Sequence, residues 1–216
     1  MTRRLRIALL GLLGLALLVA LPGTAAASPG PATCNGTLEP GTYHQLLVPQ
    51  GAICISNGPV TVRGRRHREG RHVVLGSEET TGGTGTISGG VHATNPASVQ
   101  IHFATINGGI DVQGGSGPFG PPFDVTFNAI EDNHINGGAT VQGYDGFWFG
   151  FIRNDVNGAV NLNDNGLTDP DANEYVTNTI HGSLNCAGNS PAPQIGDSEG
   201  SPNQVTGAKT GQCAGL

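Results

Sequence analysis

The chain has 216 residues, of which 36 are glycine, and sixteen Asp or Glu against ten Lys or Arg give it a formal net charge of −6. This length fits one domain, and the acidic balance excludes a general nucleic-acid binder. Glycine this frequent without a collagen period is common in disordered chains, but apolar residues alternate with polar ones through much of this chain, which argues against disorder.

Residues 1–27 have the pattern of an export signal. Arg3, Arg4 and Arg6 precede an apolar run from Ile7 to Leu21, and small residues at 25–27 suit a signal peptidase. The alternative is a membrane anchor, but the run is short for a span. We therefore expect a secreted or cell-envelope-associated protein with no stable membrane span after cleavage. The export route is either the general or the twin-arginine pathway. The chain without this segment carries a net charge of −9.

Residues 28–50 are predicted to be a Pro/Gly-rich lead-in and cap, and residues 51–216 the main domain. In the main domain the frame Asn-x-(Val/Ile)-x-Gly is complete at 133–137, 154–158, 178–182 and 203–207. Looser versions end at Gly58, Gly89 and Gly108, and the seven glycines recur every 25 residues on average.

Alternating runs before and after each glycine have the period of half-buried strands, and no amphipathic helix is predicted. Each unit therefore reads as strand, corner, strand and loop, with Asn and Gly expected to supply the left-handed backbone of the corner. Such units bury a continuous core only when they stack, which predicts an all-β solenoid.

The asparagines of the four complete frames, Asn133, Asn154, Asn178 and Asn203, are predicted to form an amide ladder in which each side chain bonds the next coil. The alternative is that they serve only as turn formers.

The repeated frame, the coil length and the lack of helices resemble right-handed parallel β-helix proteins of the pectate-lyase-like type. The C-terminal run 178–213 is similar to the tails of small exported bacterial proteins of unassigned function. The resemblance implies a single-stranded right-handed parallel β-helix of about six to seven short coils. It carries little information about function, because one fold hosts many activities.

Four cysteines in an exported chain predict two disulfides, Cys34–Cys54 and Cys186–Cys213. The separations of 20 and 27 residues are each close to one coil, which would bring the partners onto neighbouring strands. A disulfide near each end of the solenoid would hold the terminal strands in place. Zinc would need closer ligand spacing.

A basic loop holds five of the seven Lys and Arg residues outside the export signal: Arg63, Arg65, Arg66, Arg68 and Arg71. Guanidinium groups bind carboxylate or phosphate in bidentate fashion, so the predicted partner is an anionic polysaccharide or another envelope polymer. The alternative is a solvated loop that contacts the protein's own acidic stretches.

Sugar stacking is a hypothesis for Trp148, the only tryptophan of the chain, with Tyr144 and Asp145 beside it. Alternation places Phe147, Phe149 and Phe151 in the core and turns Trp148 outward. The alternative is that a neighbouring loop covers Trp148.

A calcium site is a second hypothesis, for the loop that follows Leu162, because oxygen ligands alternate around a glycine as in an EF-hand loop. The ligands would be Asn161, Asn163, Asn165 and Asp169. The closing Glu and the flanking helices of an EF-hand are missing, and the alternative is a polar loop without metal. No other cofactor is expected.

Catalysis by glycoside hydrolysis would need two carboxyl groups at a defined separation. The candidates are six aspartates: Asp111, Asp124, Asp132, Asp145, Asp155 and Asp164. Their positions are typical of solvated turn residues, and the sequence contains no lyase signature. We therefore predict no catalytic residue. His92, His102 and His181 are expected to face solvent without forming a metal ladder. The sequence favours an exported, non-catalytic solenoid with a structural or glycan-binding role, and the alternative is a polysaccharide lyase or glycoside hydrolase on the same scaffold.

Overall fold

The computed structural model describes residues 32–33, 36–38, 41–43, 46–47, 54–56, 60–62, 72–75, 85–96, 98–116, 127–196 and 200–216. Within these residues the regular structure consists of strands only, β1 to β25, and the strands of its sheets pair in parallel. The prediction of an all-β chain is confirmed for this part of the protein. None of it forms a helix of the length and apolar character that a membrane span requires.

Three sheets contain most of the strands. Sheet 1 has the order β21-β17-β13-β10-β7 and consists of β7 (His72–Leu75), β10 (Ser98–His102), β13 (Phe127–Glu131), β17 (Trp148–Ile152) and β21 (Glu174–Val176). Sheet 2 runs in the order β24-β22-β18-β14-β11-β8-β6-β3 and consists of β3 (Gly41–Tyr43), β6 (Val60–Val62), β8 (Gly85–Ile87), β11 (Ala104–Ile106), β14 (His134–Ile135), β18 (Asp155–Val156), β22 (Thr179–Ile180) and β24 (Gln204–Val205).

Sheet 3 has the order β25-β23-β19-β15-β12-β9 and consists of β9 (Val91–Thr94), β12 (Ile110–Gln113), β15 (Ala139–Gln142), β19 (Val160–Asn163), β23 (Leu184–Ala187) and β25 (Lys209–Gly211). Three further pairs complete the described strands: β1 (Ala32–Thr33) with β4 (Leu46–Leu47), β2 (Gly36–Leu38) with β5 (Cys54–Ser56), and β16 (Asp145–Gly146) with β20 (Gly166–Leu167).

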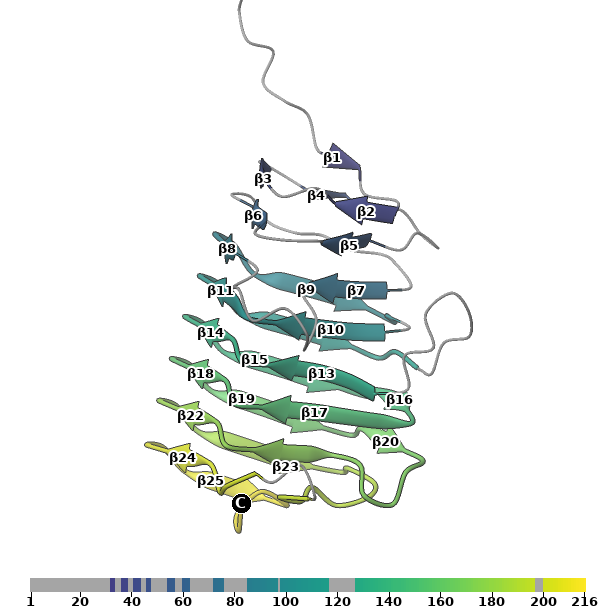
Figure 1. Cartoon of the computed structure of the whole chain (residues 1–216). Coiled ribbons are helices and arrows are strands. Elements are labelled where there is room, and N and C mark those ends of the chain that lie inside the picture. The colour runs from purple at the N-terminus through teal and green to yellow at the C-terminus, as the bar shows by residue number, and fades with distance from the viewer. Residues whose placement is uncertain are drawn as a thin grey trace, which may run out of the picture.

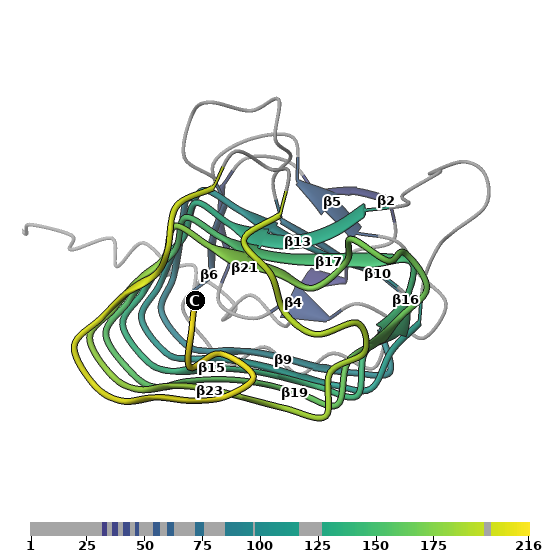
Figure 2. The ribbon, with the colours of Figure 1, turned by 90° about the horizontal axis from the view of Figure 1, so that it is seen from below.

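The chain visits sheets 1, 2 and 3 in turn and then starts again, as in β10, β11, β12 and then β13, β14, β15. We call one such passage a circuit. Successive circuits lie on top of one another from the N-terminal to the C-terminal end (Figure 1). Viewed along this stack, sheets 1 and 3 lie on opposite sides of the interior (Figure 2).

The core lies between the sheets and is built from columns of like residues. Sheet 2 contributes the inward column Ile106, Ile135, Val156 and Ile180, which are the hydrophobic residues of the repeated frame and are each 0 % exposed. Sheets 1 and 3 contribute alternate residues of their strands, such as Phe151 and Leu162. The period-2 pattern thus acts through stacking, because each apolar side chain packs on its counterpart in the next circuit.

The glycines of the frame are required by close backbone packing. A Cβ on Gly137 would lie 2.7 Å from the backbone of Gly108, and one on Gly158 would lie 2.6 Å from the backbone nitrogen of Gly138. The expectation that the frame's Asn and Gly are left-handed is wrong. Positive φ occurs instead at the residue just before the Asn, as at Asp132 (φ 56°) and Arg153 (φ 50°).

The export signal at 1–27 lies outside the described residues, and the division between a cap at 28–50 and a domain from residue 51 stays a prediction.

Candidate functional site

The buried corner between sheets 1 and 2 holds the four frame asparagines in one row. The Asn133 side chain donates to Oδ1 of Asn154 at 3.0 Å, Asn154 to Asn178 at 3.0 Å, and Asn178 to Asn203 at 2.8 Å. Each amide also donates to a backbone carbonyl of sheet 1, as Asn154 does to Ile130. Oδ1 of Asn154, Asn178 and Asn203 accepts a second bond from the backbone N–H of the preceding asparagine in the row, and Oδ1 of Asn133 accepts from that of Ala104, so the row satisfies its buried polar groups.

A second buried row, which the sequence analysis missed, follows sheet 3. Oδ1 of Asn165 accepts from the backbone N–H of Tyr144 at 3.0 Å, and Oδ1 of Asn189 accepts from that of Asn165 at 3.0 Å. Gln212 closes the row by accepting from the backbone N–H of Asn189. The signal was the 24-residue spacing of Asn165 and Asn189, the same as that of Asn154 and Asn178.

The four proposed calcium ligands are each engaged within the protein. Asn165 is buried in the second row, and Asn161 accepts from the side chain of Asn185 at 2.9 Å. Asn163 and Asp169 accept from backbone N–H groups of Ala187 and Asp171. Within the described residues no group of three or more His, Cys, Asp or Glu is arranged to hold a metal ion.

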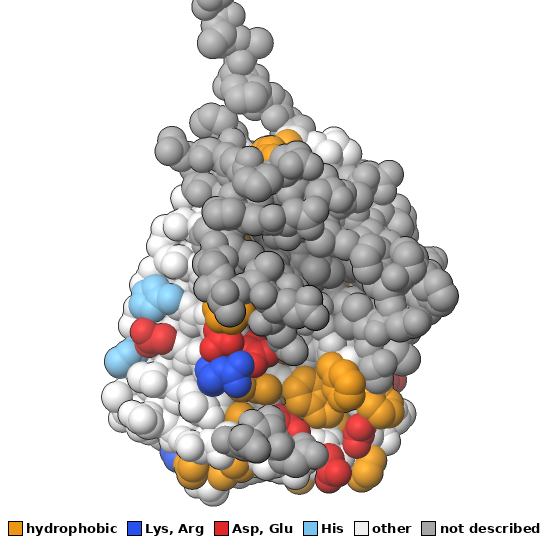
Figure 3. All heavy atoms as spheres, in the orientation of Figure 1, with side chains coloured by type: hydrophobic (Ala, Val, Ile, Leu, Met, Phe, Trp, Pro, Cys, Tyr) orange, Lys and Arg blue, Asp and Glu red, His pale blue; other side chains and the backbone are white. Residues whose placement is uncertain are grey.

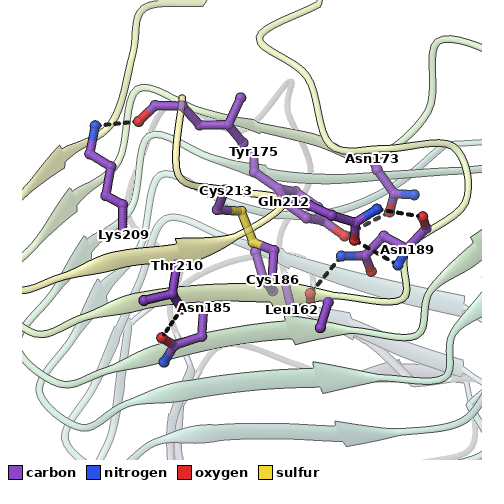
Figure 4. Close-up of a disulfide and its surroundings, with 12 residues drawn as sticks. Leu162, Asn173, Tyr175, Asn185, Cys186, Asn189, Lys209, Thr210, Gln212 and Cys213 are labelled. Atoms are coloured by element: carbon purple, nitrogen blue, oxygen red, sulfur yellow. Dashed lines mark hydrogen bonds between the residues drawn. A yellow bond between two sulfur atoms is a disulfide. The ribbon is translucent and has the colours of Figure 1, made fainter.

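One predicted disulfide is confirmed: Cys186 on β23 is bonded to Cys213, with 5.3 Å between their Cα atoms. It fastens the C-terminal segment to the last full circuit, beside Tyr175 and Asn189 (Figure 4). The pair Cys34–Cys54 and the basic loop with Arg63, Arg65, Arg66, Arg68 and Arg71 cannot be placed, because those side chains lie outside the described residues.

The outer face of sheet 1 differs from an ordinary solvated sheet. Its outward positions Ala129, Ile152 and Val176 are buried although they do not belong to the core cluster. Trp148 accounts for part of this cover, since a Cβ on Gly150 would lie 2.5 Å from the tip of the Trp148 ring. The sequence Trp148-Phe-Gly-Phe151 therefore combines two buried phenylalanines with a glycine that makes room for the outward tryptophan.

Three aromatic side chains form what we call the aromatic patch: Phe127, Phe147 and Trp148. Phe127 is 55 % exposed and is the only exposed large hydrophobic residue in the part of the chain that the structure describes. Its ring meets those of Trp148 and Phe147 edge to face, with centroids 5.6 Å and 6.1 Å apart. On the face shown in Figure 3 the largest of several groups of hydrophobic atoms lies at the lower right, on the side from which β13 and β17 start in Figure 1.

The aromatic patch corrects two expectations. Tyr144 is fully buried, with its ring 5.6 Å from that of Phe149, so it cannot offer a ring face to a sugar. Phe147, expected in the core, is half-buried, because it precedes β17 and so escapes the alternation of that strand. Phe127 takes the place that the sequence analysis gave to Tyr144. The sequence feature that could have identified Phe127 is its separation of 21 residues from Trp148, which equals the separation of Asn133 and Asn154.

At the other end of the same strands lies a charged cluster of His102, Glu131, Asp132 and Arg153. The Arg153 guanidinium donates to both carboxylate oxygens of Asp132, at 2.9 and 3.0 Å, and also to Glu131. Glu131 is only 6 % exposed, and hydrogen bonding to Asp132 raises the pKa of Arg153. One guanidinium therefore bridges two carboxylates, and the charged side chains of the cluster sum to −1.

His102 lies beneath this cluster and is 1 % exposed, so the expectation that it faces solvent is wrong. Its Nε2 is 2.6 Å from Oε1 of Gln100, and its Nδ1 is 3.6 Å from the Glu131 carboxylate. Burial lowers the pKa of His102 to about 4, which makes the ring neutral at pH 7. His92 and His181 do lie at the surface, where they contact Asp111 at 2.7 Å and Asp155 at 3.2 Å.

Comparison with models of protein families, with curated proteins and with solved structures finds no match to this chain.

Proposed function

We propose that this protein is an exported, non-catalytic right-handed parallel β-helix that binds carbohydrate on the outer face of sheet 1. The repeated circuits and their in-register parallel strands support the β-helix, and the export pattern at 1–27 supports the location at the cell envelope or outside the cell.

One observation carries the proposal: the aromatic patch, in which Phe127 stays 55 % exposed beside Trp148 and Phe147. An exposed aromatic cluster on a soluble protein marks an interaction site, because leaving it in water is unfavourable. Aromatic rings offer apolar faces of the size of a sugar ring, and a stack of paired strands that positions them in advance lowers the entropic cost of binding. A carbohydrate that covers the patch would bury the surface of Phe127.

The enzymatic alternative has one observation in its favour, the two buried carboxyl side chains Glu131 and Glu174 on sheet 1. They lie on β13 and β21, and between them β17 places Gly150 and Ile152 at the corresponding positions. Glu131 is also paired with Arg153. A carboxylate held by an ion pair is a poor proton donor, because the charged form is stabilised. These features favour binding over hydrolysis.

A glycan array probed with the purified protein tests the proposal. The wild-type protein should bind a restricted set of glycans. The variant Phe127→Ala should lose most of this binding, and Thr140→Ala, on the outer face of sheet 3, should bind like the wild type. If both variants bind like the wild type, a site at the aromatic patch is refuted. Incubation of the hits with the protein, followed by a reducing-end assay, separates the two functions: release of new ends would favour the enzyme.

A further inference from the structure

We infer that the carbohydrate bound at the aromatic patch carries free amino groups. This inference rests on the proposed function and adds the chemical class of the ligand. It comes from the charges at the rim of the patch, which are independent of the aromatic rings.

The rim is acidic. Asp145 is exposed and lies two residues before Phe147. Asp169 belongs to the next circuit and donates its backbone N–H to the carbonyl of Phe147 at 3.1 Å. Asp171 is exposed and donates its backbone N–H to the Asp169 carboxylate at 3.0 Å. In Figure 3 acidic side chains border the hydrophobic group on this face.

No described Lys or Arg compensates this rim. The described residues contain only two such side chains, Arg153 and Lys209. Arg153 follows the C-terminal end of β17, whereas Trp148 begins that strand, and its guanidinium is already bound by Glu131 and Asp132. Lys209 donates to the carbonyl of Leu216 at the C-terminal end of the stack.

The patch itself favours the same sign of ligand charge. The face of an aromatic ring carries partial negative charge, so it attracts an ammonium group and repels a carboxylate. One exposed cation–π contact and one surface charge pair together correspond to a preference of about three- to tenfold for the protonated amine. A neutral sugar would gain only the apolar contact, and a uronic acid would be repelled by both rings and rim.

The basic loop gives a different expectation, because its arginines favour an anionic polymer. The two expectations concern different residues, and only a ligand at the aromatic patch changes the environment of Trp148. The inference is therefore tested with a signal from Trp148, the only tryptophan of the chain.

The experiment compares three hexasaccharides of equal length by Trp148 fluorescence at pH 5.5: glucosamine, N-acetylglucosamine and galacturonic acid. We expect the glucosamine hexamer to bind about three- to tenfold more tightly than its acetylated counterpart. Asp145→Asn with Asp171→Asn should reduce this preference, because only the cation–π part remains, while keeping the binding of the acetylated hexamer. Asp111→Asn with Asp155→Asn, which removes the same charge from sheets 3 and 2, should leave the preference unchanged.

Each other outcome is decisive. Equal affinity for the glucosamine and N-acetylglucosamine hexamers, or stronger binding of the galacturonic acid hexamer, would overturn the inference and leave the proposed function standing. Binding of hexalysine as tight as that of the glucosamine hexamer would also overturn it, because charge alone would then suffice. If no saccharide changes the fluorescence, the inference is overturned, and if the glycan array is empty as well, the proposed function falls with it.

Discussion

The outer faces of sheets 1 and 3 belong to the same circuits and yet differ in kind. On sheet 3 the outward column His92, Asp111, Thr140, Asn161 and Asn185 consists of polar side chains on five successive strands. Several of them bond their neighbours, as Asn185 does to Asn161 at 2.9 Å. On sheet 1 the corresponding positions hold an exposed phenylalanine, a tryptophan over a glycine and the buried Glu131 of the charged cluster.

The difference teaches which features belong to the fold and which do not. Both faces have parallel in-register strands, pack on the same core and lie beside a buried asparagine row, so none of these requires the aromatic patch or the charged cluster. Sheet 3 demonstrates that a column of small polar residues is enough to finish an outer face. The departure on sheet 1, where apolar rings are left in water, is therefore the part that stability does not explain.

The largest effect is expected in the first asparagine row, whose side chains bond the backbone of sheet 1 from the corner with sheet 2. Asn154→Ala removes two bonds that Asn154 donates and leaves the buried backbone and side-chain N–H groups of Asn133 without their acceptor. Unfolding in denaturant should show a loss of about 3–5 kcal/mol, because buried unsatisfied polar groups are costly. A loss below 1 kcal/mol would show that the row contributes little to holding successive circuits together.

Removal of the disulfide should act on one end of the stack. Replacing Cys186 and Cys213 by Ala opens a loop whose cysteines are 27 residues apart. The expected loss of stability is about 3–4 kcal/mol in the loop-entropy account. Ligand binding at the aromatic patch should persist in the folded variant, and hydrogen exchange should increase first in β24 and β25. Exchange that increases equally in β10 and β13 would contradict a local role.

Acid should weaken the face of sheet 1 through His102. The pKa of His102 is about 4 in the folded protein, because it is buried, against 6.5 for the exposed group. The ring is neutral in both states above pH 6.5, and between pH 6.5 and 4 protons bind the unfolded chain preferentially. Stability should therefore fall by about 3 kcal/mol over this window. His102→Gln should show a smaller fall, and an unchanged fall would assign the pH dependence to other groups.

The smallest effect is expected on the outer face of sheet 3. Asn161→Ala removes one part-buried side-chain bond, to Asn185, and should cost about 0.5 kcal/mol. Binding at the aromatic patch should be unaffected. A loss as large as that of Asn154→Ala would remove the distinction between the buried row and the outer column.

The sequence predicted the features that repeat and failed where tertiary contacts decide. The alternating runs gave parallel strands, and the spacing of Cys186 and Cys213 gave their disulfide. The left-handed position was misplaced by one residue: the frame asparagines bond the next circuit through their backbone N–H groups, and positive φ falls on the preceding Asp132 and Arg153. Tyr144 was expected outside, but it occupies the corner position equivalent to Asn165 and turns its ring into the core.

The central claim, that carbohydrate covers the aromatic patch, is tested most directly by quenching Trp148 fluorescence with acrylamide. The signal comes from one side chain, since the chain has a single tryptophan. A saturating oligosaccharide from the glycan array should lower the quenching constant of wild type, because it shields the half-buried ring from acrylamide, and should do so far less in Phe127→Ala. An oligosaccharide that binds with full affinity and leaves the quenching constant unchanged would contradict the account.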